Sequence, residues 1–415
     1  MLSIDFIRAN PELVKTAAKN KNRAVDVDRI LVLDEQKRSL VRDIQMVREE
    51  RNALAKQAFS DEVKTRGIEL KEKLRDLEKK EAEIETELND LMSRVPNVPY
   101  DEVPVGTDES GNVEIKTVGE PTRFDFEPKS HIELGLALDL FDTERGSKVS
   151  GFRGYFLKNE GAQLQFAIMF YVFQKLAAKG YTPIIAPAIV KGFALFGAAQ
   201  FPWGELEVYK LNDDAYLSGT AEVPVTAYYA NETLKEEDLP KKFVAFSPCY
   251  RKEAGSYGKD TKGLYRVHEF FKIEQVIIGK ADKTAAIELH EELQRNCEEI
   301  LQDLELPYRV LLMCTGDMGE PQHKKYDTET WMPSRNGYGE TMSNSIMGDF
   351  QTRRLNIRYK TKDGEMKYTY SFNNTAVASP RILIAILENY QQKDGTVRVP
   401  KALQPLMGKA VIGAK

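Results

Sequence analysis

Hydrophobic residues recur with a helical period in two stretches near the N-terminus. Between about residues 26 and 57, Leu33, Leu40, Ile44, Val47 and Leu54 are separated by seven, four, three and seven positions. This spacing is the heptad pattern of a coiled-coil seam. After a break over residues 59–67 the pattern resumes, and it ends before two prolines; its apolar positions are Leu70, Leu74, Leu77, Ile84, Leu88, Leu91 and Val95. We therefore expect two helices of about 30 residues, each about 45 Å long, packed as an antiparallel hairpin.

Beyond Pro96 and Pro99 the pattern changes to one of short apolar runs separated by loops. Residues 101–128 have little periodicity and predict a linker with one hairpin around residues 110–112. Helical periodicity returns over residues 130–142, 161–180, 283–304 and 380–392. Strands are expected over residues 181–190, 242–251, 263–278, 308–314, 349–359 and 365–374. This order predicts an α+β protein, with a helical arm over residues 1–104 and an antiparallel sheet flanked by helices over residues 105–415.

The run at residues 181–190 contains Pro183 and Pro187 among β-branched residues. Proline has no amide hydrogen for a sheet ladder, so it is tolerated mainly on edge strands. We expect this strand at a sheet boundary or at a subunit interface.

Composition narrows the class of protein and its setting. The chain has 415 residues, 30% of them charged, and a formal net charge of only -5, so a nucleic-acid partner would need a local basic surface. Its three cysteines are far apart and match neither a disulfide framework nor zinc-ligand spacing. The N-terminus lacks a signal-peptide core, and no apolar run is long enough to span a membrane. These features favour a reducing cytoplasm and no membrane association.

Candidate chemistry is concentrated between Cys249 and Ile278. Two strands joined by a polar loop would bring cationic, acidic and aromatic side chains onto one face, namely Arg251, Glu253, Arg266, His268, Phe270 and Glu274. Such a face suits a nucleotide held beside a charged small molecule. His268 is either a general base or a packed histidine, and the second interpretation is the more common one.

The sequence lacks a glycine-rich phosphate loop of either common type, so phosphates would need side chains. Arg251, Arg266 and Arg381 are the candidates, because a guanidinium offers planar bidentate donors. Each could instead be a solvated surface residue, but each lies in or beside an apolar segment. Glu340 and Ser343 supply the oxygen ligands that suit Mg²⁺ on a polyphosphate. The alternative for this pair is an ordinary exposed strand face.

Taken together and in order, these segments resemble the bacterial-type seryl-tRNA synthetases, which are class II aminoacyl-tRNA synthetases. GYTPIIAP resembles motif 1, YRKEAGSYGKDTKGLYRVHEFFKIE resembles motif 2, and FNNTAVASPRILIAILENYQQKDGTVRVP resembles motif 3. The stretches TAE at Thr220 and CTGDMG at Cys314 resemble serine-specific segments. The sequence departs from the family pattern in a shorter segment before the TAE stretch, which ends with Ser218 and Gly219, and at Ile346 and Pro380, where asparagine and glycine are usual.

The resemblance implies an ATP-dependent ligase of protein biosynthesis that forms seryl-adenylate and esterifies serine tRNA, with selenocysteine tRNA as a second possible acceptor. It implies that Arg251 and Arg381 are catalytic, with Arg251 on the α-phosphate, Arg266 on the γ-phosphate, and adenine between Phe270 and Arg381. It assigns the ATP site to Arg251, Glu253, Arg266, Val267, Phe270, Glu340, Ser343 and Arg381. The serine site would comprise Thr220, Glu222, Arg251, Glu274 and Thr375, and the Mg²⁺ ligands would be Glu340 and Ser343.

The same resemblance implies a homodimer formed through motif 1 around Pro187, and an arm that binds the tRNA through Arg38, Arg42 and Lys71. Alternatives remain at this stage. The hairpin could be a purely structural coiled coil with a solvated mixed-charge face. The chain could charge a carrier protein instead of tRNA, although such relatives are expected to lack the arm. It could also be a non-enzymatic coiled-coil protein with a decayed catalytic body, which the retained motif arginines disfavour.

Overall fold

A computed structural model describes residues 1–254 and 262–413 of the chain. It divides into two compact units, Met1–Val98 and Pro99–Lys415. The division falls at residue 98, six residues before the end of the arm expected from the sequence.

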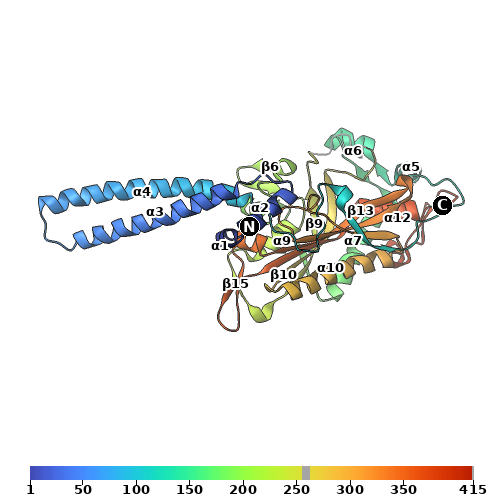
Figure 1. Cartoon of the computed structure of the whole chain (residues 1–415). Helices are drawn as coiled ribbons and strands as arrows, with labels where there is room; N and C mark the ends of the chain where they lie inside the picture. Colours follow the sequence, from blue (N-terminus) through green and yellow to red (C-terminus); the bar gives the residue numbers. More distant parts are fainter. Residues whose placement is uncertain (255–261, 414–415) are drawn as a thin grey trace. The chain divides into compact units, whose positions relative to one another are not determined.

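The first unit consists of helices, namely α1 (Ile4–Ala9), α2 (Pro11–Asn20), α3 (Val27–Leu54) and α4 (Asp61–Ser93). The long helices begin at capping side chains: Asp26 accepts from the amide of Arg29, and Ser60 accepts from that of Val63. Helices α3 and α4 lie side by side (Figure 1). The predicted helical hairpin is confirmed.

Ion pairs between the two long helices fix their relative direction. Partners on α4 move backwards as those on α3 move forwards, as in the pairs Arg29–Glu87 (2.7 Å), Lys37–Glu85 (2.8 Å) and Arg48–Glu78 (2.8 Å). The helices are therefore antiparallel. Part of the predicted seam is buried between them as one cluster, formed by Ile44, Val47, Leu70 and Leu74.

The second unit is built on a large sheet, which over the described residues has eight strands in the order β1-β11-β12-β13-β16-β10-β9-β4. Their bounds are β1 Val113–Val118, β4 Thr182–Ile185, β9 Lys241–Tyr250, β10 Glu269–Gly279, β11 Tyr308–Leu312, β12 Lys324–Met332, β13 Gly337–Gly348 and β16 Tyr370–Ala378. Neighbouring strands are antiparallel except β4 and β9, which are parallel. The predicted antiparallel sheet is confirmed, and the proline-containing strand lies at its edge.

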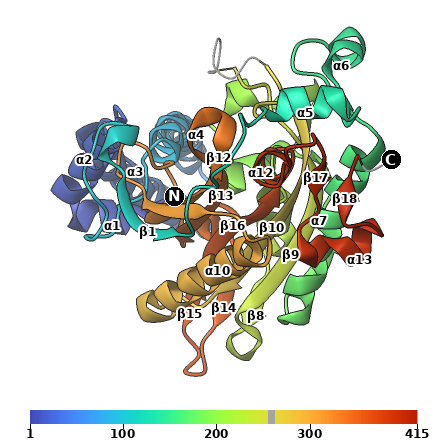
Figure 2. The same cartoon turned by 90° about the vertical axis from the view of Figure 1, so that its right-hand side faces the viewer.

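Three helices cover one face of this sheet (Figure 2), namely α7 Asn159–Ala178, α10 Lys283–Asp303 and α12 Arg381–Asn389. The other helices of the unit are α5 His131–Ala137, α6 Thr143–Ser150, α8 Gly192–Gly197, α9 Glu222–Thr226, α11 Phe350–Arg354 and α13 Gln404–Met407. Apolar side chains of α7, α10 and α12 join inward-facing residues such as Ile273 and Phe372 in the main hydrophobic core. The strand residues between them point to the opposite face, where the candidate site lies.

Short strands form smaller sheets outside this framework. They are β2 Phe141–Asp142 with β3 Phe156–Leu157, β5 Ile189–Val190 with β7 Ala215–Leu217 and β6 Tyr209–Asn212, β8 Thr233–Lys235 with β14 Arg358–Lys360 and β15 Met366–Tyr368, and β17 Val397–Arg398 with β18 Val411–Ile412. None of the helices in the described part of the chain combines the length and apolar composition that a membrane crossing requires.

Three sequence predictions are wrong at the level of elements. The strand expected over residues 349–359 is the buried helix α11 followed by β14. The hairpin expected around residues 110–112 is a helical turn that leads into β1, which pairs with β11. The strand expected from residue 263 begins only at Glu269. In each case long-range packing outweighs the local pattern.

Candidate active site

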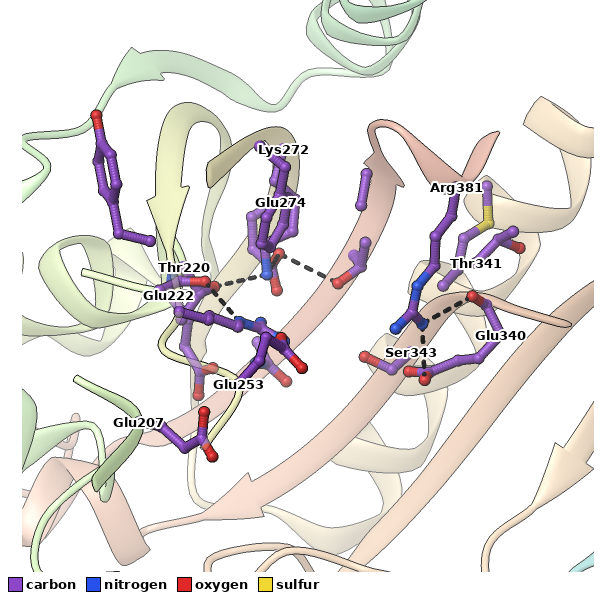
Figure 3. A pocket seen from close by; sticks show the side chains of 18 of the residues that line it. Glu207, Thr220, Glu222, Glu253, Lys272, Glu274, Glu340, Thr341, Ser343 and Arg381 are labelled. Carbon is purple, nitrogen blue, oxygen red and sulfur yellow. Dashed lines mark hydrogen bonds and ion pairs between the residues drawn. The ribbon is translucent and has the colours of Figure 1, made fainter. Parts of the chain in front are cut away.

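A cavity of about 630 Å³ opens on the face of the sheet opposite α10. Its lining includes all of the substrate-site residues predicted in the second unit: Thr220, Glu222, Arg251, Glu253, Arg266, Val267, Phe270, Glu274, Glu340, Ser343, Thr375 and Arg381. Figure 3 shows Glu274 from β10, Glu340 and Ser343 from β13 and Arg381 from the N-terminus of α12 converging on this space. The structure brings the residues together, while their individual roles remain predictions.

One end of the cavity holds a buried cluster around Glu274. Alternation along β10 turns Phe270, Lys272 and Glu274 to the same face. The ammonium of Lys272 lies 2.5 Å from Glu274 Oε2 and donates to Thr220 Oγ1 at 2.7 Å (Figure 3). Thr375 Oγ1 donates to the same carboxylate oxygen at 3.3 Å. The sequence interpretation missed Lys272, whose alternation with Phe270 and Glu274 was the available signal.

Glu222 lies at the floor of this end. Burial, followed by the negative charge of Glu274, raises the pKa of Glu222 to about 7. Its Oε1 accepts from Gln351 Nε2 at 2.7 Å, which ties the site to α11. The helix that replaces a predicted strand therefore supports the pocket floor.

Arg251 and Arg266 both line the cavity and, in the sequence, precede and follow residues 255–261. Arg251 Nε donates to the carbonyl of Gly219 at 3.2 Å, and its guanidinium lies 5.4 Å from the centre of the Phe270 ring. Arg266 pairs with Glu253 at 2.7 Å. The part of the motif 2 segment that spans residues 255–261 lies outside the described residues.

Arg381 lies across the cavity from Glu274. It donates to the backbone oxygen of Glu340 at 3.0 Å and to its Oε2 at 3.1 Å (Figure 3). Its guanidinium is 4.4 Å from the centre of the Tyr265 ring, and that of Arg335 is 3.7 Å from the same ring centre. Both guanidinium groups therefore lie against this one ring, and Tyr265 contacts Arg381 within the cavity lining.

Glu340 and Ser343 are three positions apart on β13, a separation that places side chains on opposite faces of a regular strand. Thr328 pairs with Met342, but Glu329 pairs with Glu340, so Thr341 is an extra residue that forms a β-bulge. The bulge restores the two oxygen-bearing side chains to one face, where both line the cavity. Burial alone would raise the pKa of Glu340, but Arg381 and Lys325 outweigh it and hold that pKa below its usual value.

Lys325 also lines the cavity and was not anticipated. Its ammonium lies 2.9 Å from Asp327 Oδ2, and Asp327 faces Ser343 across the β12–β13 ladder. Burial raises the pKa of Asp327 to about 7 even though Lys325 opposes the shift. By contrast, His268 bonds to the backbone oxygen of Arg251 at 2.9 Å and is not among the lining residues.

The positions that depart from the family pattern are accommodated by the local structure. Ile346 is fully buried in the main core. Pro380 occupies the N-cap of α12 and lines the cavity beside Arg381. Ser218 donates through its hydroxyl to the carbonyl of Thr220 at 2.7 Å and so shapes the turn that carries this threonine.

Comparison with known proteins places this geometry in a family. Residues 1–99 match the model of the seryl-tRNA synthetase N-terminal domain, and residues 206–390 match that of the tRNA synthetase class II core domain (G, H, P, S and T). A serine–tRNA ligase of Deinococcus radiodurans is 44% identical over 100% of this chain and 99% of its own length. The chain belongs to the seryl-tRNA synthetase family. Its predicted class as a serine–tRNA ligase is confirmed at this level.

Solved structures of seryl-tRNA synthetases share the whole fold. The enzyme of Pyrococcus horikoshii complexed with ATP has a TM-score of 0.93 and 39% identity, with 99% of each chain covered. The cytoplasmic serine–tRNA ligase of Naegleria fowleri in complex with AMP has a TM-score of 0.87 and 32% identity, with 97% of this chain and 95% of that chain covered.

Proposed function

We propose that this chain activates L-serine with ATP to form seryl-adenylate and pyrophosphate, and then transfers the seryl group to the 3′ end of serine tRNA. The observation that carries the proposal is a single cavity in which a buried, hydrogen-bonded carboxylate at Glu274 faces the arginines of a phosphate site, Arg251 and Arg381. A small polar zwitterion and a nucleotide would lie side by side in this space.

Activation requires positioning and charge neutralisation more than proton transfer. The serine carboxylate is already an anion when it attacks the α-phosphorus in line, so no protein base has to activate it. Arg251 would hold the α-phosphate and the attacking carboxylate together, because its guanidinium reaches the cavity between Gly219 and Phe270. Arg266 would meet the γ-phosphate of the leaving pyrophosphate once it exchanges its contact with Glu253 for the nucleotide.

Adenine would stack between Phe270 and Arg381, as expected from the resemblance. Tyr265 covers one face of the Arg381 guanidinium at 4.4 Å, which leaves its other face for a base. Phe270 already has Arg251 near its ring at 5.4 Å, so that cation has to share or leave the ring when the nucleotide enters. Val267, buried beside Arg266, would form part of the ATP pocket.

The donor set fits Mg²⁺. Glu340 and Ser343 share one face through the bulge at Thr341 and offer hard oxygen ligands beside the phosphate arginines. When bound there, Mg²⁺ would neutralise phosphate charge and favour departure of the pyrophosphate. Arg381 would hold the Glu340 carboxylate in position through the contact at 3.1 Å.

The arm would bind serine tRNA, with affinity arising from phosphate contacts and therefore from local basic residues. The three proposed residues differ in how closely their positive charges are already paired with acidic side chains. Lys71 makes no ion pair with another described side chain, whereas Arg38 contacts Asp34 at 3.2 Å and also Glu35. Arg42 is 4.0 Å from Glu35. Lys71 and Arg42 are thus the freer cations for a phosphate.

Dimerisation through motif 1 is part of the same proposal. Ile185 at the end of edge strand β4 is 76% exposed, and Phe166 and Phe170 on the adjacent helix α7 are 62% and 51% exposed. Burial of these apolar side chains against a second copy would stabilise a symmetric dimer.

The three cysteines are free and buried, which supports the expectation of a reducing cytoplasm.

The two remaining alternatives lose support from these observations. A ligase for carrier proteins is expected to lack the arm, yet residues 1–99 match the seryl-tRNA synthetase N-terminal domain. A decayed body is expected to have lost its motif arginines, yet Arg251, Arg266 and Arg381 all line the cavity.

Amino-acid-dependent exchange of pyrophosphate into ATP tests the proposal. We expect exchange with serine, little with alanine or threonine, and loss of activity in Arg381→Ala. Charging of serine tRNA and of selenocysteine tRNA with serine, measured in parallel, then shows whether one or both are acceptors. Exchange with a different amino acid, or none, would contradict the proposal.

A further inference from the structure

Lys272 is a cation buried inside a pocket that has to admit another cation, the ammonium of an amino acid. It is 4% exposed and lies two residues before Glu274 on β10. A buried ammonium is costly unless it is paired and hydrogen-bonded. Both of its partners, Glu274 and Thr220, belong to the proposed serine site.

The contacts of Lys272 and Thr375 decide which carboxylate oxygen of Glu274 remains available. Oε2 receives the ammonium at 2.5 Å and the hydroxyl of Thr375 at 3.3 Å. The described side chains and backbone give Oε1 no hydrogen bond, so Oε1 is the acceptor presented to a ligand.

The same ammonium determines the direction in which the Thr220 hydroxyl can form a further hydrogen bond. The hydroxyl oxygen of Thr220 accepts from Lys272 Nζ at 2.7 Å and from the amide of Glu222 at 3.2 Å. Because a hydroxyl has two acceptor sites and one proton, its proton remains to be donated to another group. An acceptor at Glu274 and a donor at Thr220 therefore stand on either side of one cation.

We propose that Lys272 is a specificity-determining positioning residue, which orients Glu274 Oε1 as an acceptor and the Thr220 hydroxyl as a donor so that together they match the hydroxyl of the bound amino acid. A hydroxyl both donates and accepts, and it satisfies both groups at once. Alanine would leave both unpaired, and a site that is left without such partners rejects the ligand strongly. The inference rests on the proposed function and extends it to the choice between serine and alanine.

The test is pyrophosphate exchange by Lys272→Met, which keeps most of the side-chain volume and removes the ammonium. We expect the KM for serine to rise about 10- to 100-fold, the size of one charge-assisted hydrogen bond. The KM for ATP should stay within about twofold, and the ratio of serine to alanine kcat/KM should fall about 10-fold or more. Lys242→Met is the matched control, because it removes another lysine–glutamate pair, with Glu292 at 2.7 Å, from the neighbouring strand β9.

Thr220→Val is the second variant, because it keeps the pair of Lys272 and Glu274 and removes only the donor hydroxyl. It should lower the same ratio even if Lys272→Met fails to fold. A double mutant of Lys272→Met with Glu274→Gln should lose less activity than the sum of the two single effects, since both act on one carboxylate.

A serine-to-alanine ratio that is unchanged in Thr220→Val, or in folded Lys272→Met, overturns the inference and leaves the proposed function standing. Equal rises in the KM values for serine and ATP in Lys272→Met also overturn it, because they indicate a structural role only. Absence of serine-dependent exchange in the unaltered protein overturns the proposed function, and the inference falls with it.

Discussion

Protonation of Glu222, a single residue of the pocket, should affect the stability of the folded protein. It is 6% exposed, and burial and then the charge of Glu274 move its pKa from 4.5 to about 7. Between these values the folded protein keeps a proton that the unfolded chain has released. Proton binding by the folded state stabilises it, so this contribution is complete below pH 4.5 and disappears as pH rises to about 7.

We predict that Glu222→Gln removes this pH dependence. The wild-type free energy of unfolding should fall relative to that of the variant by up to about 1.4 kcal/mol per pH unit inside the window. Melting curves of both proteins, recorded across the window from pH 4.5 to about 7, measure the effect. Glu288→Gln, at an exposed position on α10, is the control. Parallel curves for wild type and Glu222→Gln would show that Glu222 binds its proton equally in the folded and unfolded states.

Tyr265 provides a second test at a single residue, because its ring contacts the guanidinium groups of both Arg335 and Arg381. We predict that Tyr265→Leu raises the KM for ATP about 2- to 30-fold, the range of a cation–π contact worth about 0.5–2 kcal/mol. The KM for serine should change little. Tyr265→Phe keeps the ring and should behave like wild type. A normal KM for ATP in Tyr265→Leu would mean that Arg381 needs no support from this ring.

At the scale of elements, the arm combines ion pairs with a smaller number of available cations. Arg38 lies beside Asp34, whose side chain is 8% exposed and also binds Arg8 at 2.8 Å. Reversal of the charge at Arg38 would place a carboxylate against that buried acid and destabilise the helix. Lys71 is exposed and makes no such pair with the described residues, so its charge can change without this structural cost.

We predict that Lys71→Glu weakens tRNA binding and leaves the melting temperature unchanged, whereas Arg38→Glu lowers both. The slope of log affinity against log salt should fall by about 0.7–0.9 for each phosphate that the arm no longer neutralises. Filter binding of serine tRNA at several salt concentrations measures this slope, and Lys71→Gln separates removal of the positive charge from repulsion. An unchanged slope in Lys71→Glu would exclude Lys71 from the tRNA surface.

The elements also show what local pattern can predict. The heptads of α3 and α4 predict their hairpin because both helices bury apolar side chains within the arm, in two clusters. The strand predicted from Asp349 to Tyr359 is wrong because three consecutive residues of this run, Phe350 to Thr352, are buried within helix α11. Gln351 of this helix donates to Glu222. Lys272 escaped notice because one of its two partners, Thr220, lies 52 positions away in the sequence and is brought to it only by the fold. Site residues that belong to sequence motifs could be predicted from the sequence. Site residues whose role depends on long-range contacts could not.

At the scale of the whole molecule, the chain divides into two units that each have their own buried core. The proposed chemistry lies within the second unit, while the proposed tRNA surface lies on the first. The two steps of the reaction should therefore be separable by deletion.

We predict that replacement of residues 26–95 by a short linker leaves serine-dependent pyrophosphate exchange within about threefold of wild type, because the second unit retains its own core. Serylation of tRNA should fall below detection. Thin-layer assays of both reactions on the same preparation measure the difference. Charging of tRNA by the deleted protein at close to the original rate would make the hairpin a structural element only.

The bulge at Thr341 has a consequence for how this family of sequences tolerates change. Substitution of Thr341 would keep the number of residues between Glu340 and Ser343, and with it the shared face of the two side chains. Removal of Thr341 would leave the two residues two positions apart on a regular ladder and still on one face, whereas insertion of one residue between them would turn one of the two oxygens toward the protein core. An extra codon in this segment is thus more damaging than a missing one or than most altered ones, because the site depends on a count of residues as much as on their identity.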